Sequence, residues 1–177
     1  MWKTLTFTFG ALLLAVVLIF GYFFVSGIYT KSTDNRRLIQ LSPVEKDLVL
    51  GEMRTMLKAV NGVIDALSKG DMSNAAVAAS SAGMAMAVDV NPMLMAKLPL
   101  DFKELGMGTH GQFDELAAQI KSGTSQDLVL QKLSSITSRC IACHEVNRLG
   151  MNDRFKNKLV FSSLQLSLSQ KGLVTIK

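Results

Sequence analysis

The sequence predicts an all-α protein in which one transmembrane helix precedes an antiparallel four-helix bundle. Two observations carry this prediction. Residues 4–30 contain no charged side chain, and residues 42–148 contain four apolar patterns of helical period joined by short turns. No segment of residues 42–148 shows the alternation of apolar and polar residues that is typical of a strand.

The uncharged N-terminal run is long enough to cross a membrane. About 20 helical residues span the hydrocarbon core, and this run is longer. A cleaved signal peptide is the alternative, but such peptides have a shorter apolar region and an Ala-x-Ala-like cleavage site, which does not follow the run. Trp2, Tyr22 and Tyr29 are suited to the membrane interface. We therefore expect residues 1–30 to form an uncleaved transmembrane anchor.

A polar linker over residues 31–41 is expected to separate the anchor from the bundle. The first bundle helix is predicted to begin after Ser42, which can cap it. Pro43 fits the first helical position, and Glu45 completes a capping box. Apolar residues then recur at helical spacing until Gly70 ends the helix.

Three further helices complete the predicted bundle. The second is rich in alanine, which permits close helix contact, and it ends at Asn91-Pro92. The third begins near Asp101 and ends at Gly123. The fourth is predicted to start after Thr124 and to continue to the end of the bundle.

The formal net charge of +5 belongs to the two ends of the chain. Residues 1–39 carry a net charge of +3, residues 40–148 a net charge of −2 and residues 149–177 a net charge of +4. A nucleic-acid-binding protein should carry its basic surface on the folded domain, so no nucleic-acid partner is expected. The basic tail over residues 149–177 contains a short strand-like alternation at 164–169 and receives no place in the bundle.

The residues Cys140-Ile141-Ala142-Cys143-His144 form a C-x-x-C-H sequence, which is the spacing of c-type haem attachment. Two thiols one helical turn apart can each form a thioether with a haem vinyl group, and the adjacent imidazole can bind the iron. The alternatives are a redox pair, a zinc half-site or chance. A redox pair normally accompanies a βαβ pattern, a zinc site needs two more ligands, and both cysteines of the chain lie in this motif. The motif predicts one covalent haem c.

This motif near the end of the last of four helices resembles the cytochrome c′ family, including its low-spin members. Arg148, four residues after His144, matches an arginine common in that family, and Phe113 matches a phenylalanine that packs near the haem. The aromatic residue often found just before the arginine is Asn147 here. The resemblance covers residues 42–148 and implies that Arg148 and Phe113 contribute to haem binding together with the motif.

The resemblance also implies that the first bundle helix crosses the distal face of the haem. Low-spin members place a methionine ligand there, whereas others leave the iron five-coordinate. Met53 and Met56 lie on the apolar stripe of this helix, and we expect one of them, with Met56 preferred, to bind the iron. Core packing is the alternative, because methionine often fills gaps in cores. An open site, His110 and Met107 are further candidates.

These features indicate a membrane-anchored c-type cytochrome that transfers electrons to or from redox partner proteins. An enzyme is not expected, because no acid, base or substrate pocket accompanies the haem motif. The alternatives are a five-coordinate haem protein that binds NO or CO and a haem subunit of a larger respiratory complex. A homodimer is a further expectation from the resemblance.

The haem chemistry and the charge pattern disagree about the location of the haem domain. Lys31, Arg36 and Arg37 follow the anchor, and the positive-inside rule would place them in the cytoplasm. Covalent haem attachment in bacteria takes place outside the cytoplasmic membrane. We therefore expect an anchor in the bacterial cytoplasmic membrane and a haem domain that faces the periplasm.

Overall fold

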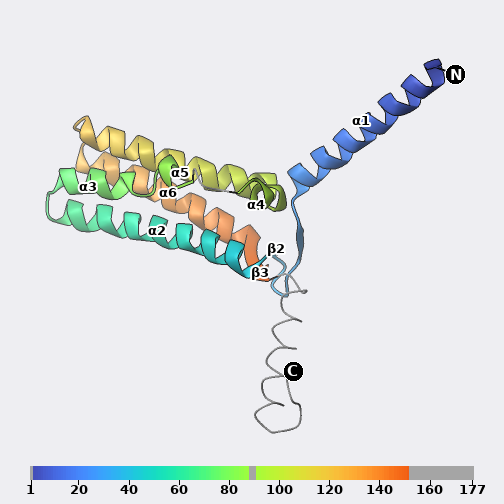
Figure 1. Ribbon diagram of the computed structural model, residues 1–177. Coiled ribbons are helices and arrows are strands. Elements are labelled where there is room, and N and C mark those ends of the chain that lie inside the picture. Colours follow the sequence, from blue (N-terminus) through green and yellow to red (C-terminus); the bar gives the residue numbers. More distant parts are fainter. Residues whose placement is uncertain (1, 88–90, 152–177) are drawn as a thin grey trace, which may run out of the picture.

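The computed structural model describes residues 2–87 and 91–151. This part of the chain is mostly helical (Figure 1), and the strand-like leucines at 164–169 lie outside it. In chain order the elements are α1 (Trp2–Ser26), β1 (Tyr29–Lys31), β2 (Arg37–Leu41), α2 (Pro43–Ser68), α3 (Met72–Ser80), the 3-10 helix η1 (Met84–Ala87), α4 (Pro92–Lys97), α5 (Leu100–Lys121), α6 (Gln126–Val146) and β3 (Asn147–Met151).

Among the described residues, α1 is the one helix that is long and apolar enough to cross a membrane. Its stretch Thr4–Ser26 has 23 residues with a mean hydropathy of 2.5, and none of it is buried against the rest of the chain. At 1.5 Å per residue such a helix is about 35 Å long, which matches the hydrocarbon core of a bilayer. Figure 1 shows α1 projecting away from the other helices.

The elements α2 to α6 form a helical body. α2 contacts α3, α3 contacts α5, α5 contacts α6, and α6 contacts α2, so these contacts close into a ring. The four helices lie side by side in Figure 1, and the short α4 lies next to the base of α1.

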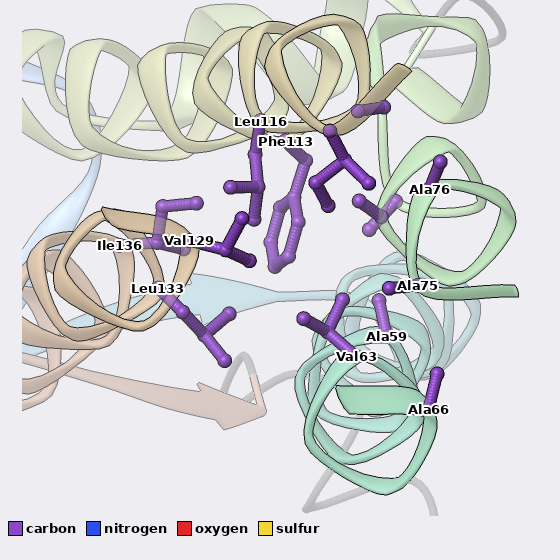
Figure 2. Close-up of a cluster of buried hydrophobic side chains, with 14 of the residues drawn as sticks. Ala59, Val63, Ala66, Ala75, Ala76, Phe113, Leu116, Val129, Leu133 and Ile136 are labelled. Carbon is purple, nitrogen blue, oxygen red and sulfur yellow. The ribbon is translucent and has the colours of Figure 1, made fainter. Parts of the chain in front are cut away.

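The larger core of the body lies near the turn that joins α2 to α3. Figure 2 shows the ring of Phe113 projecting from α5 between side chains of α6 and those of α2 and α3. α2 and α3 contribute mainly alanines, and a Cβ at Gly62 would lie only 3.0 Å from the Cβ of Ala78. The buried members are Ala59, Val63, Ala66, Leu67, Ala75, Ala76, Ala79, Ala82, Phe113, Leu116, Ala117, Ile120, Val129, Leu133 and Ile136.

Local signals in the sequence place the first two helices of the body. The Ser42 backbone N–H donates to Glu45 Oε2 at 2.8 Å, and the Glu45 N–H donates to Ser42 Oγ at 3.4 Å. The predicted capping box is therefore confirmed. α2 ends before Gly70, whose φ of +69° lies in the left-handed region, and Asp71 Oδ1 accepts from the N–H of Asn74 at 2.9 Å to cap α3.

A small three-stranded sheet departs from the all-α prediction. β2 pairs antiparallel with β1 and parallel with β3, so part of the predicted linker over residues 31–41 and the start of the predicted tail are strands. Ile39 and Leu41 are fully buried, whereas Leu38 and Gln40 remain partly exposed. The run is short and its partner β3 follows the last helix, so no local pattern indicated this pairing.

A smaller core joins this sheet to the body, and the segment after α1 lies against the end of α4. Its buried residues are Ile39, Leu41, Val49, Leu94, Leu98 and Phe102. Gly27, with a φ of +67°, passes so close to α4 that a Cβ there would lie 2.4 Å from the nitrogen of Pro99. The next N–H, that of Ile28, donates to the carbonyl of Lys97 at 2.7 Å. These contacts attach the end of α1 to the body directly.

Lys103 of α5 caps the C-terminal end of α1. Its Nζ donates to the carbonyl oxygen of Phe24 at 2.6 Å and lies 3.7 Å from the centre of the Phe24 ring. A cation at a helix C-terminus stabilises carbonyl groups that lack helical partners. The side chain is buried, and this burial lowers the pKa of the Lys103 ammonium group.

Candidate functional site

An apolar cavity of about 650 Å³ lies between α2, α4, α5 and α6, nearer to the anchor than the larger core. Its walls come mainly from residues 49–60 of α2, residues 94–110 of α4 and α5, and residues 137–144 of α6. Cavities of about 300–1,000 Å³ with mostly apolar walls are typical of cofactor and small-ligand sites. The cavity is therefore the candidate site of the protein.

The C-x-x-C-H residues occupy the last turns of α6. Positions i, i+3 and i+4 of a helix share one face, and Cys140, Cys143 and His144 all line the cavity. The two thiols are free and partly buried, and Cys140 Sγ donates to the carbonyl of Ile136 at a sulfur–oxygen distance of 3.6 Å. The His144 side chain is exposed. The structure thus brings the three predicted haem-attachment residues to one wall of the cavity.

The electrostatic setting of the thiols differs from that of a redox pair. Reactive C-x-x-C thiols have a lowered pKa, often at a helix N-terminus. Here burial raises the pKa of both Cys140 and Cys143, and both lie near the C-terminal end of α6. Within residues 2–87 and 91–151, no group of three or more His, Cys, Asp or Glu side chains is placed to hold a metal ion. The raised pKa of both thiols is the opposite of what a reactive redox pair requires.

The candidate distal ligands reach the same cavity. Met53 and Met56 line it from α2, and Met107 and His110 line it from α5. Both α2 methionines are partly buried: Met53 packs against the smaller core and Met56 against the larger one. All four candidate side chains from the sequence therefore lie on the cavity wall.

His110 is held in one ring orientation. It is 3% exposed, and its Nδ1 lies 2.7 Å from the carbonyl oxygen of Ala82. Because a carbonyl only accepts hydrogen bonds, Nδ1 is the donor in this contact, and Nε2 is the ring nitrogen that remains for another partner. Burial raises the pKa of the nearby Glu52 carboxyl, and the charge of His110 partly offsets this shift.

Phe113 lies away from the motif, whereas Arg148 lies beside it. Phe113 is fully buried in the larger core and is not among the described residues that line the cavity. Arg148 lies in β3 and lines a second hollow of about 150 Å³, which shares Cys143 and His144 with the cavity. Its Nη1 lies 3.8 Å from Asp34 Oδ2.

Two contacts near the motif were not foreseen. Arg139, just before the first cysteine, donates from Nε to Thr109 Oγ1 at 3.3 Å and from Nη2 to the Glu104 carbonyl at 3.2 Å. Gly108 makes room for it, because a Cβ there would lie 2.4 Å from Arg139 Nη2. The glycine at position 108 was the signal available in the sequence, but a glycine within a helix by itself indicates only a lower helix propensity.

The second unforeseen contact comes from the segment between β1 and β2. Arg36 Nη1 donates to the carbonyl oxygen of His144 at 3.0 Å, and the Arg36 guanidinium is paired with Asp34 at 2.7 Å. The contact joins parts of the chain that are distant in sequence, so no local pattern could reveal it.

The residues at the cavity have the chemistry that a c-type haem requires. Two thiols and an imidazole line one side, thioether and imidazole donors line others, and the remaining wall is largely apolar. No protein-family model matches the chain, and neither a curated protein nor a solved structure matches it. The functional assignment therefore depends on the motif and on the cavity that it lines.

Proposed function

We propose that this protein is a c-type haem protein with one haem c in the cavity of the helical body. Cys140 and Cys143 hold it through thioethers, and His144 binds the iron. The observation that carries the proposal is that all three residues of the C-x-x-C-H motif line one apolar cavity that also contains candidate distal ligands.

More specifically, we propose a membrane-anchored electron carrier that resembles the cytochrome c′ family. In this proposal α2, α3, α5 and α6 are the helices of an antiparallel four-helix bundle, with the motif at the end of the last helix. The ring of contacts among these four helices and the position of Cys140–His144 in α6 support it. Bound haem would supply a one-electron centre, and the largely apolar walls would pack against it.

Met56 is the proposed sixth ligand, with Met53 and His110 as the rivals. Met56 lines the cavity from α2, whereas His144 lines it from α6. A thioether ligand raises the reduction potential, which suits a carrier of electrons. An iron with no sixth ligand would favour binding of NO or CO instead.

The anchor and the haem site form one connected unit in this proposal. Lys103 lines the cavity and also donates to the last turn of α1 through Phe24. With α1 in the bacterial cytoplasmic membrane and the body in the periplasm, the cavity is held close to the membrane surface. Redox partners in or at that membrane, including a larger respiratory complex, are therefore the proposed partners.

The haem proposal is tested by an absorption spectrum and a denaturing gel. The purified protein should show haem absorption, and the haem should stay on the chain after denaturation because thioethers are covalent. Loss of haem on denaturation would refute covalent attachment. A low-spin spectrum favours the electron carrier, whereas a high-spin spectrum that shifts with CO favours the gas-binding alternative.

The location is tested by protease added to spheroplasts. The helical body should be digested while α1 is spared, because only the body would face the periplasm. Full protection of the body would place it in the cytoplasm, as the charges of Lys31, Arg36 and Arg37 indicate.

A further inference from the structure

Asn147 carries a buried acceptor that nothing in the described part of the chain satisfies. This residue ends α6, its side chain is 6% exposed, and its Oδ1 has no hydrogen-bond partner among the described residues. Its Nδ2 donates to the carbonyl oxygen of Cys143 at 3.2 Å. A carbonyl cannot donate, so the amide must face Cys143 with its nitrogen, and its oxygen is directed elsewhere. Buried acceptors without a donor are rare in folded proteins.

Besides Asn147, four residues that line the second hollow carry side-chain N–H donors. Asn147 lines the second hollow together with Arg36, Lys46, His144 and Arg148. The guanidinium of Arg36 forms an ion pair with Asp34 and donates to the carbonyl oxygen of His144. The guanidinium of Arg148 also lies near Asp34, at 3.8 Å.

His144 differs from these donors because it lines both the cavity and the second hollow. An imidazole that binds iron through Nε2 keeps a proton on Nδ1, and this N–H points away from the metal. Metal-binding histidines almost always donate that second N–H to a carbonyl, a carboxylate or water. Asn147 lies on the side of His144 that lines the second hollow.

We propose that Asn147 Oδ1 accepts a hydrogen bond from the Nδ1–H of His144 and so positions the proximal ligand. The inference rests on the proposed ligation of iron by His144. The bond fixes the tautomer and the ring orientation of His144, and it makes the imidazole a stronger electron donor to the iron. Asn147 thereby lowers the reduction potential of the site without touching the haem iron.

The test compares Asn147→Leu with Gln112→Leu in the haem-loaded full-length protein. Gln112 is a matched control, because its Oε1 is the other buried side-chain oxygen without a partner in the described residues, and it lines neither hollow. Two quantities are measured: the reduction potential, and the rate at which the His144 Nδ1–H exchanges with solvent. The exchange rate is measured by NMR in the diamagnetic ferrous state, and CO is added if the iron lacks a sixth ligand.

In the wild type and in Gln112→Leu the Nδ1–H should exchange slowly. Asn147→Leu should speed its exchange about tenfold or more and move the potential to more positive values. Asn147→Asp keeps an acceptor in place and should show slow exchange, as the wild type does. This variant provides the test if Asn147→Leu does not fold. Rapid exchange in the wild type or in Asn147→Asp, with haem retained on a denaturing gel, overturns this inference alone. Loss of haem from the wild type on that gel overturns the proposed function and the inference with it.

Discussion

Near the turn between α2 and α3, the helices α2, α3, α5 and α6 fill the space between them with their own side chains, whereas near the anchor α2, α4, α5 and α6 surround a cavity of about 650 Å³. Phe113 is fully buried in the first region. In the second, Leu57 and Ile141 line the cavity and remain 69% and 59% exposed. Apolar residues at helical spacing therefore form a complete core at one end and an apolar wall at the other.

Under the proposed function, this difference makes the cavity end the functional end of the body. Exposed apolar side chains around a cavity lose the hydrophobic stabilisation that the larger core obtains from its own packing. A bound apolar group would recover it. Under the proposed function, the haem fills the cavity and completes the apolar packing near the anchor. The larger core is complete without a cofactor.

The largest expected effect is loss of the haem itself. Replacing Cys140 and Cys143 together by alanine should abolish haem staining on a denaturing gel, because no thioether can form. Without the haem, amides of residues 49–57 should exchange with solvent about tenfold faster or more, since ligand binding stabilises the region that it contacts. Amides of residues 113–120 should keep their protection. Equal loss of protection in both segments would show that the two ends are not independent.

Phe113→Ala probes the end that the chain fills by itself. Because Phe113 is fully buried in the larger core, its loss should lower the free energy of unfolding by about 3–5 kcal/mol. The absorption spectrum should stay unchanged. Phe102→Ala is the control, since Phe102 lines the cavity and its loss should alter the spectrum too. A changed spectrum of Phe113→Ala with an unchanged free energy of unfolding would instead support the haem contact that the family resemblance implies.

Met56→Ala and Met53→Ala distinguish a distal ligand from a packing side chain. Removal of the true sixth ligand should turn a low-spin spectrum high-spin and lower the reduction potential. Removal of a packing methionine should instead cost about 0.5–3 kcal/mol of stability with the spectrum intact. If neither variant changes the spin state of a low-spin wild type, His110→Ala should change it.

Glu52→Gln gives the smallest expected effect and depends on pH. Burial raises the pKa of Glu52 above 4.5 in the folded protein, so its stabilising contribution exists at low pH and is lost as pH rises through the folded pKa. The glutamine variant should therefore be more stable than the wild type at neutral pH, by less than about 1 kcal/mol because the side chain is only partly buried. Denaturant unfolding below pH 4.5 should show no gain. A gain that persists there would assign the effect to packing.

The sequence was informative where short-range chemistry decides. Ser42 and Glu45 form the predicted capping box, and α1 has the length and hydropathy that its uncharged run predicted. The C-x-x-C-H spacing places Cys140, Cys143 and His144 on one helix face whatever surrounds the helix. Each of these features depends on hydrogen bonds or spacing within about one or two turns of the chain.

Contacts between distant segments were decided only by the tertiary structure. β2 pairs with β3, Arg36 donates to the His144 carbonyl, and Arg139 fits over Gly108. The family resemblance implied that Phe113 contributes to haem binding, but whether its ring faces the larger core or the cavity depends on how α5 is rotated against its neighbours. The sequence by itself determined the anchor-like helix, the helix caps and the haem-attachment spacing, because these are local. Strand pairing, side-chain packing and the cavity that joins the motif to Met53, Met56 and His110 required the fold, because they arise from surfaces that meet only when the helices pack.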